Sequence, residues 1–283
     1  MSSLVSPSDI VARLRAAGCV FAEEEAQLLI AEARTPDELG AMVDRRAKGL
    51  PLEYVVGWAE FCGLRIAVDE GVFVPRRRTE FLVRQAADTV RRTATSDDPI
   101  TPGRTVIVDL CCGSGAIAAA LSVALPDVDV HAADIDPVAV RCARRNLGQY
   151  AGQVYVGNFY DALPAALQGH VDILVANVPY VPSSAVRLLP VEARMHEPQV
   201  ALDGGADGLD VVRTVAERAN LWLVENGHLL VETSEGQAAE TREIFASNGL
   251  LPRVLSSAEW NATVVIGRRS TAPTTAASSG QRQ

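Results

Sequence analysis

The fold is decided by the stretch VIVDLCCGSG, residues 106–115. Its first five residues have the apolar character of a buried strand, two glycines follow, and a helical pattern starts near residue 115. Glycine lets the backbone approach a ligand closely, and the amino end of a helix favours polar or anionic groups. A strand, a glycine-rich turn and a helix in this order predict an α/β unit whose loop binds a cofactor.

From residue 104 onward, strands and helices alternate along the chain in the sequence pattern. We predict strands at residues 106–110, 128–133, 153–156, 173–176, 227–232, 252–256 and 263–267. We predict helices at residues 115–125, 137–147, 208–225 and 236–248. Such alternation predicts a Rossmann-like α/β fold with a mostly parallel seven-stranded sheet and helices on both faces.

Four segments are expected along the chain. Residues 1–58 form a small helical domain, with helix starts at the capping sequences SPSD (6–9) and TPDE (35–38). Residues 59–103 contain a hairpin turning at 69–71, a helix over 80–92 and a polar loop at 93–99. Residues 104–269 form the α/β domain, and the Ser-, Thr-, Ala- and Gly-rich tail 270–283 is expected to be disordered.

Composition narrows the range of functions. The chain has 283 residues, 48% of them hydrophobic, with a net charge of −9, which disfavours direct binding of nucleic acid. We find no apolar run long enough to span a membrane and no secretory signal, so a cytoplasmic protein is expected. The five cysteines lack paired spacing, which argues against disulfides and a zinc site, and no metal is expected.

The sequence NVPY, residues 177–180, follows a predicted buried strand, at the sheet edge where open α/β folds bind ligands. The Asn177 side-chain oxygen and the neighbouring carbonyl, that of Val178, can accept two hydrogen bonds from a planar NH2 group. Pro179 fixes the turn, and Tyr180 can stack on the acceptor. The arrangement suits group transfer to an amino or amide nitrogen, although Asn and Pro also favour ordinary turns.

The glycine loop alone leaves two cofactors open. Residues 113–118 also fit the dinucleotide pattern G-x-G-x-x-A, and Asp134 lies about 20 residues further on, as in NAD-binding proteins. However, Asp109 would repel a pyrophosphate, whereas it can hold the ammonium group of S-adenosylmethionine. Asp134 can accept hydrogen bonds from ribose hydroxyls. Either aspartate can instead be a helix cap.

Several ordered segments together point to one family. The matching segments are residues 51–57, 60–64, 74–80, 109–115, 134–136, 197–198, 201–209 and 232–237. On these segments the chain resembles, over about residues 5–267, the HemK/PrmC family, whose members methylate a glutamine side-chain amide in class I peptide release factors. The resemblance implies the class I S-adenosylmethionine-dependent methyltransferase fold, with the N-terminal helical domain recognising the substrate protein.

The resemblance also implies site residues. One set of residues is placed around the methionine part, the ribose and the adenine of S-adenosylmethionine. The set consists of Asp109, Cys111, Gly113, Gly115, Asp134, Ile135, Asn158 and Phe159. The resemblance places Asn177 at the cofactor as well as at the acceptor amide. Around that amide the resemblance adds the Val178 carbonyl, Pro179, Tyr180 and Glu197. Glu197 can instead have only a structural role, as one partner of an ion pair.

Two departures from the family pattern concern the substrate. Val178 replaces the first proline of NPPY, and Arg77-Arg78 replaces Pro-Glu. Taken by itself, the run Arg76–Arg78 is typical of a solvated surface. Amino-group methylation of DNA or RNA is one alternative function, although it usually requires a basic recognition region and base flipping. A cofactor-binding protein that has lost turnover through Val178 is another, and an NAD-dependent oxidoreductase is a third.

Overall fold

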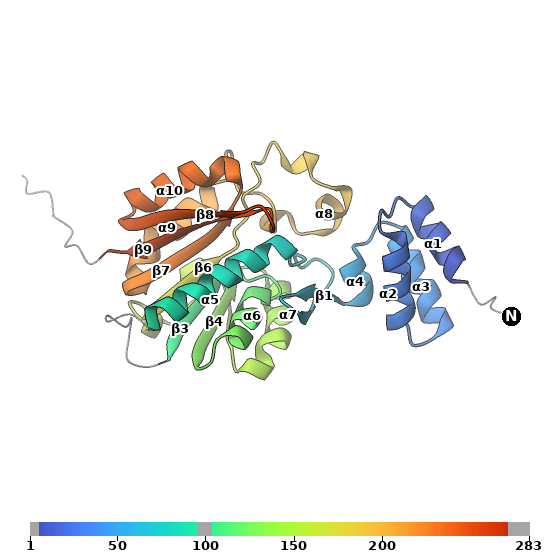
Figure 1. Ribbon diagram of the computed structural model, residues 1–283, viewed down its shortest axis with the longest axis horizontal. Helices are drawn as coiled ribbons and strands as arrows, with labels where there is room; N and C mark the ends of the chain where they lie inside the picture. The colour runs from blue at the N-terminus through green and yellow to red at the C-terminus, as the bar shows by residue number, and fades with distance from the viewer. Residues whose placement is uncertain (1–5, 95–103, 271–283) are drawn as a thin grey trace, which may run out of the picture.

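A seven-stranded sheet forms the centre of the molecule in the computed structural model, which describes residues 6–94 and 104–270 (Figure 1). The strand order is β5-β4-β3-β6-β7-β9-β8. The strands are β3 (Thr105–Leu110), β4 (Val128–Asp134), β5 (Gln153–Val156), β6 (Val171–Ala176), β7 (Leu223–Thr233), β8 (Leu250–Ser257) and β9 (Ala262–Arg269). The first five in this order are parallel, and β9 pairs antiparallel with β7 and β8. The predicted fold class and all seven predicted strands are confirmed.

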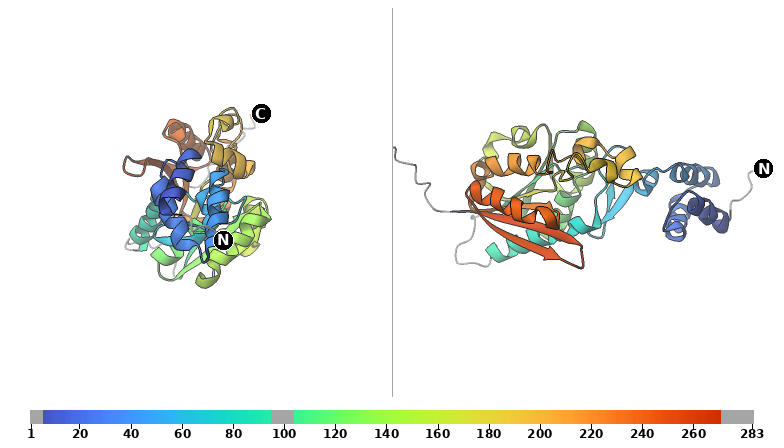
Figure 2. Two further views of the ribbon diagram at one scale, coloured as in Figure 1. Left: turned by 90° about the vertical axis from the view of Figure 1, so that its right-hand side faces the viewer. Right: turned by 90° about the horizontal axis from the view of Figure 1, so that it is seen from above.

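Helices cover both faces of this sheet (Figures 1 and 2). One face packs against α5 (Glu80–Ala94), α6 (Ala116–Ala124) and α7 (Pro137–Leu147), and the other against α9 (Asp210–Trp222) and α10 (Ala238–Ser247). Successive strand residues point to opposite faces. Accordingly, Ile107 belongs to the first core cluster and Val108 to the second, and both are fully buried.

The strand order places a topological switch point between β3 and β6. From β3 the chain moves outward to β4 and β5, and it then returns to β6 on the other side of β3. Open α/β sheets bind ligands at the carboxyl ends of the strands at such a point. All six residues of β6 are buried, so the turn that follows this strand is anchored in the core.

The N-terminal helices form a hydrophobic cluster of their own. They are α1 (Pro7–Ala16), α2 (Ala22–Glu32), α3 (Pro36–Ala47) and α4 (Leu52–Val56), and they lie at the opposite end of the molecule from β8 and β9 (Figure 1). Ser6 is the predicted N-cap of α1 and forms a capping box with Asp9. At the capping box predicted for α3, Thr35 accepts a 3.1 Å hydrogen bond from Glu38 N. The predicted domain limits at residues 58, 103 and 269 stay a prediction.

The predicted hairpin exists, but its predicted turn is wrong. Strands β1 (Trp58–Phe61) and β2 (Leu64–Ala67) pair around Cys62 and Gly63, not around residues 69–71. These two residues have φ values of 51° and 73°, and two-residue hairpin loops favour successive positive φ angles. The residues at 69–71 instead form a turn after β2, closed by a 3.1 Å bond from Val72 N to Asp69 O.

The loop predicted at 93–99 is also partly wrong, because α5 continues to Ala94. The rest of that loop and residues 271–283 of the predicted disordered tail lie outside the described residues. Within the described ranges, 6–94 and 104–270, we find no helix with the length and apolar character needed to cross a membrane.

Candidate active site

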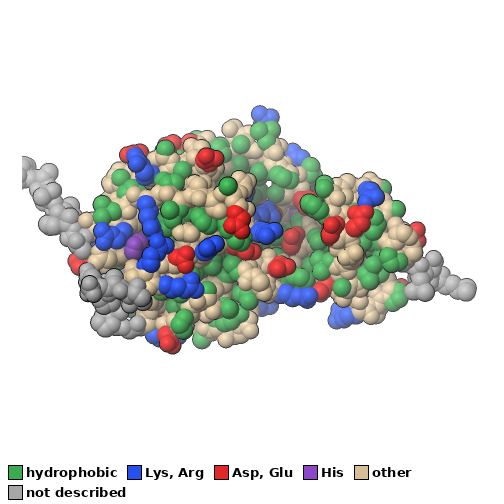
Figure 3. Space-filling model, in the orientation of Figure 1, with side chains coloured by type: hydrophobic (Ala, Val, Ile, Leu, Met, Phe, Trp, Pro, Cys, Tyr) green, Lys and Arg blue, Asp and Glu red, His purple; other side chains and the backbone are tan. Residues whose placement is uncertain are grey.

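A cavity of about 850 Å³ opens at the carboxyl ends of β3, β4 and β6. Its walls come mainly from the loops that follow these three strands and β5, and from residues 51–53, 72–79 and 189–202. The space-filling view shows the molecule hollowed between the N-terminal helices and the sheet domain (Figure 3). Of the predicted site residues, the cavity wall includes Cys111, Gly113, Asp134, Ile135, Asn158, Phe159, Asn177, Val178, Pro179, Tyr180 and Glu197. Asp109 and Gly115 lie outside this wall.

Gly115 supports the glycine loop from behind. It precedes α6 with a φ of 76°, and a Cβ there would lie 3.0 Å from Ala143 Cβ and 3.1 Å from Ala143 Cα. Such contacts are tighter than most real Cβ contacts, and the positive φ would strain any other residue, so both favour glycine. Gly115 therefore lets α6 pack closely against α7, while the preceding residues Cys111 and Gly113, with φ values of 55° and 53°, face the cavity.

Backbone N–H groups hold Asp134, at the end of β4. Its Oδ2 accepts a 2.8 Å hydrogen bond from Gly113 N, and its Oδ1 accepts one of 2.9 Å from Asp136 N. The alternative that Asp134 caps α7 is wrong, because Asp136 is the cap and accepts a 2.8 Å bond from Val138 N. A carboxylate has about four acceptor positions, so both Asp134 oxygens can accept a further bond from a ligand.

Asp109 lies behind the glycine loop and is fully buried. Its Oδ2 accepts a 3.2 Å bond from Ala118 N in the first turn of α6, so the helix-cap alternative has a contact to support it. Its Oδ1 has no partner among the described residues. Burial raises the pKa of Asp109 to about 8, and it also raises the pKa of Asp134.

This end of the cavity fits a cationic ligand. Its wall at residues 111–117, 133–139 and 158–159 includes the carboxylates of Asp134 and Asp136 and, within the described part of the chain, no Lys or Arg. The partnerless Oδ1 of Asp109 lies behind the same loop. S-adenosylmethionine has a sulfonium and an ammonium group, so the residues present fit it.

Asn177 follows β6 directly, and its Nδ2 donates a 3.3 Å hydrogen bond to Thr79 Oγ1. Thr79 is 2% exposed and ends the 3-10 helix η1 (Arg77–Thr79). Because the amide nitrogen is held by Thr79, the Asn177 Oδ1 remains available as an acceptor. The neighbouring Val178 is 1% exposed and lines the cavity.

Tyr180 is held by a buried carboxylate, Glu232 at the end of β7. The Tyr180 hydroxyl lies 3.3 Å from Glu232 Oε1, and Arg78 Nε lies 3.3 Å from the same atom. The Arg78 guanidinium also stands over the Tyr180 ring, with Cζ 5.8 Å from its centroid. Thr79 and Glu232 had no predicted role, and their sequence signal is that they lie in segments shared with the HemK/PrmC pattern. Arg78 was predicted only as part of a solvated run that departs from that pattern.

Comparisons with known proteins show the family of this chain. Residues 98–207 match the family model "Methyltransferase small domain". A release factor glutamine methyltransferase of Geobacter sulfurreducens is 36% identical over 76% of this chain and 72% of its own. One of Streptomyces coelicolor is 39% identical over 72% and 70%. The chain belongs to the release factor glutamine methyltransferase family. A solved ribosomal protein L11 methylase of Lactobacillus delbrueckii is similar at a TM-score of 0.47 and 14% identity, over 69% of this chain and 80% of that one.

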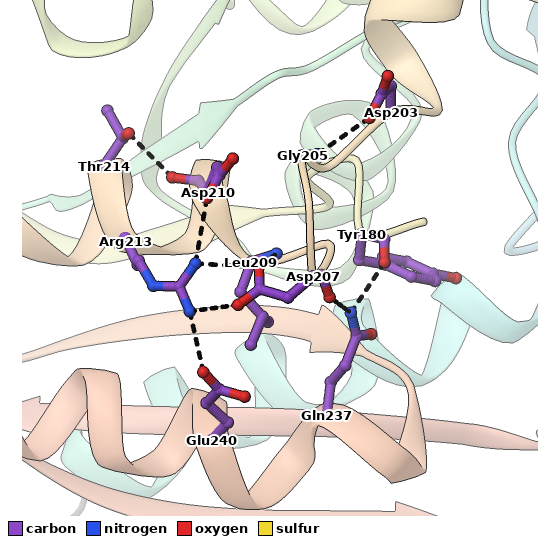
Figure 4. Close-up of polar contacts among 10 residues, drawn as sticks. All are labelled: Tyr180, Asp203, Gly205, Asp207, Leu209, Asp210, Arg213, Thr214, Gln237 and Glu240. Atoms are coloured by element: carbon purple, nitrogen blue, oxygen red, sulfur yellow. Dashed lines mark hydrogen bonds and ion pairs between the residues drawn. The ribbon is translucent and has the colours of Figure 1, made fainter. Parts of the chain in front are cut away.

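In this S-adenosylmethionine-dependent methyltransferase, the loop between Asp203 and Asp210 lies beside Tyr180 (Figure 4). Gln237 Nε2 donates 3.0 Å hydrogen bonds to the carbonyls of both Tyr180 and Asp207. A side chain at Gly208 would collide with the Tyr180 carbonyl and the Gln237 amide. Nearby, Arg213 binds Asp207, Asp210 and Glu240. The loop therefore leaves the NVPY backbone little room to shift.

Glu197 takes part in a buried ion pair. Its side chain is 1% exposed, with Oε1 2.5 Å from Arg76 and 3.4 Å from Val74 N. Arg78 likewise pairs with buried Glu232, but its own side chain is 45% exposed. Arg77 and Arg78 are therefore exposed, as the interpretation of a solvated face predicts, while Arg76 is only partly exposed and pairs with Glu197. The contribution of Glu197 to substrate binding in this methyltransferase stays a prediction.

A second ion pair joins the N-terminal helices to the cavity wall. Arg46 of α3 forms two hydrogen bonds with Glu25 of α2, at 2.6 and 3.0 Å. It forms a third, at 2.7 Å, with Glu192 of α8 (Val191–His196), which lines the cavity. The helices predicted to recognise the substrate of this methyltransferase are thus connected to the rim of the cavity.

Proposed function

We propose that this protein transfers the methyl group of S-adenosylmethionine to the side-chain amide nitrogen of a glutamine in a peptide chain release factor, at the GGQ sequence of class I factors. The names of its relatives support this substrate. The observation that carries the proposal is the Asn177 carboxamide, which is tied to Thr79 through its nitrogen so that its oxygen can accept from an incoming NH2 group.

At the acceptor, the residues of this chain activate a poor nucleophile. An amide lone pair is delocalised, and accepting both N–H hydrogens at Asn177 Oδ1 and the Val178 carbonyl favours a pyramidal nitrogen with a localised lone pair. The bound cofactor supplies a methyl group already activated by its sulfonium. Positioning of two reactants can contribute about 7–11 kcal/mol, and the amide proton becomes acidic as the bond forms, so no strong base is required beforehand.

At the other end of the cavity, we assign cofactor binding to three groups of residues. Cys111 and Gly113 surround the methionine part, with Asp109 and Gly115 behind them. Asp134 accepts the ribose hydroxyls beside Ile135, and Asn158 and Phe159 flank the adenine. Two carboxylates and a glycine loop with positive φ angles support this assignment.

The N-terminal helical domain, residues 1–58, is proposed to contact the release factor. The Arg46–Glu192 pair supports this role, because it places these helices beside the cavity. The proposed location is the cytoplasm, where release factors act.

A methyl-transfer assay tests the proposed function. The purified enzyme is incubated with radiolabelled S-adenosylmethionine and the release factor of its own source, and the product is mapped by mass spectrometry. We expect label on one glutamine, and loss of label when that glutamine is replaced by alanine. Label only on nucleic acid in a parallel incubation with total RNA and DNA would overturn the proposal, and cofactor binding without any transfer would indicate a protein that has lost turnover.

A further inference from the structure

We propose that Thr79 and Glu232 are positioning residues that fix which end of the Asn177 carboxamide faces the substrate. The inference rests on the proposed function, since it concerns the same acceptor amide. Neither residue belongs to the NVPY turn. They reach it from segments 98 residues upstream of Asn177 and 52 residues downstream of Tyr180.

The orientation of a carboxamide decides whether this site can work. The oxygen and nitrogen ends of an asparagine side chain have almost the same shape, but one accepts hydrogen bonds and the other donates them. If Asn177 presented its NH2 group to the substrate NH2 group, two donors would face each other. Asn177 therefore needs a neighbour that distinguishes its two ends.

Thr79 alone does not make this distinction. Its hydroxyl can accept from the Asn177 Nδ2, as the 3.3 Å contact shows, but a hydroxyl can equally donate to an amide oxygen. Which of the two it does depends on where its single hydrogen points. The orientation of Asn177 is thus set by the next group beyond Thr79.

That next group is the Glu232 carboxylate. Its Oε1 lies 3.3 Å from Nε of Arg78, the residue before Thr79, and 3.3 Å from the Tyr180 hydroxyl. The Thr79 side chain opposes the rise of the Glu232 pKa that burial causes, which agrees with this placement. Glu232 is 2% exposed, and its Oε2 has no partner of ordinary hydrogen-bond geometry among the described residues, so it can take the Thr79 hydrogen. An ionised carboxylate only accepts. Once the Thr79 hydrogen points to Glu232, Thr79 can only accept from Asn177, and the Asn177 oxygen must face the cavity.

Arg78 and Tyr180 are the charged and titratable groups that face Glu232 in the described structure, and both lie 3.3 Å from its Oε1. The Arg78 charge favours the ionised form of Glu232 against its burial. Arg78 stands where the family pattern has a glutamate, so this chain has its own means of keeping Glu232 an acceptor. The direction of hydrogen bonding then runs from Asn177 to Thr79 to Glu232.

A matched set of threonine variants tests the role of Thr79. Loss of one well-placed hydrogen bond corresponds to roughly a 10-fold effect, so we expect Thr79→Val to lower kcat by about 10-fold. Thr79→Ser, which keeps the hydroxyl, should stay within about 3-fold of the wild type on the same scale. Thr89→Val is the control, because Thr89 is also buried and its hydroxyl donates to the Gln85 carbonyl of its own helix. Unchanged kcat in Thr79→Val overturns the inference.

Glu232→Gln provides the second measurement, which a purely structural role would not move. In the wild type we expect kcat to fall at acid pH, because a protonated Glu232 can donate to Thr79 and reverse the hydrogen bonding. Glu232→Gln should be slower at neutral pH and lack this acid limb, while binding S-adenosylmethionine with unchanged affinity in calorimetry. An acid limb that persists in Glu232→Gln overturns the inference. If Thr79→Val fails to bind the cofactor, the pH profile of Glu232→Gln alone decides whether the inference holds. A wild-type enzyme that never labels the release factor would instead refute the proposed function.

Discussion

The two ends of the cavity are built in different ways. At the cofactor end, Asp134 is held by backbone N–H groups of Gly113 and Asp136, all within one contiguous stretch of the chain. At the acceptor end, Asn177 and Tyr180 are held by side chains that are 52 to 98 residues away in sequence. A backbone-held site survives most side-chain substitutions around it, whereas a side-chain network can be broken by one. The acceptor end should therefore be the more fragile of the two.

The largest effect is expected from Asn177→Ala. Removing one well-placed polar group that acts on the reacting atoms costs at least about 100-fold in kcat. The affinity for S-adenosylmethionine, measured by calorimetry, should stay within a few-fold of the wild type. Gln168→Ala is the control, because it removes an exposed carboxamide outside the cavity. Equal single-turnover rates in Asn177→Ala and wild type would remove the proposed role of this residue.

At the cofactor end, Asp134→Asn should weaken binding rather than catalysis. Hydrogen bonds to a charged group contribute about 1.5–3 kcal/mol, so we expect the Kd for S-adenosylmethionine to rise by roughly 10- to 100-fold. With saturating cofactor, kcat should recover most of its wild-type value. Asp129→Asn on the same strand is the control, because Asp129 does not line the cavity. A loss in kcat that high cofactor concentration does not restore would show that the two ends are not separable.

The same difference explains what could be predicted from the sequence. Apart from Asn158 and Phe159, the predicted residues of the cofactor end lie within residues 109–136. A strand, a glycine loop and a terminal aspartate follow one another there, so the strand ends and the loop were predicted correctly. The hairpin turn was misplaced because Asp69–Gly71 has turn-forming residue types, while the positive φ of Cys62 has no strong sequence signal. Thr79, Glu232 and Gln237 were not assigned roles, because only the folded sheet brings them to the NVPY turn.

Gln237→Leu should have an intermediate effect. Leucine cannot donate to the Tyr180 and Asp207 carbonyls. The Asp207 carbonyl can bond water instead, whereas a buried carbonyl left without a partner costs about 1–3 kcal/mol, and the Tyr180 carbonyl is partly buried. We expect a Tm loss together with a kcat loss of several-fold. Arg213→Leu loosens the same loop through Asp207 and Asp210 but does not contact Tyr180 (Figure 4). An equal kcat loss in both variants, at equal Tm, would contradict a specific role for the Tyr180 contact.

The smallest effect concerns stability, and it tests the buried acid behind the glycine loop. The pKa of Asp109 is raised by burial from 3.8 to about 8 in the folded protein. Between pH 4 and pH 8 the native state retains a proton on Asp109 that the unfolded chain releases. The stabilisation from the protonated Asp109 is therefore complete below pH 4 and is lost as the pH rises through 8. The slope for one such group is at most about 1.4 kcal/mol per pH unit.

Asp109→Asn removes this titration, so the Tm of the cofactor-free variant should fall less between pH 5.5 and 8 than that of the wild type. For a net difference of 1–2 kcal/mol in a protein of this size, the two falls should differ by roughly 2–8 °C. The raised pKa values of Asp134 and Glu232 act in the same direction but are present in both proteins, so they cancel in the comparison. Identical slopes would mean that Asp109 is already ionised without cofactor, and that the cofactor end holds its negative charge with backbone groups alone.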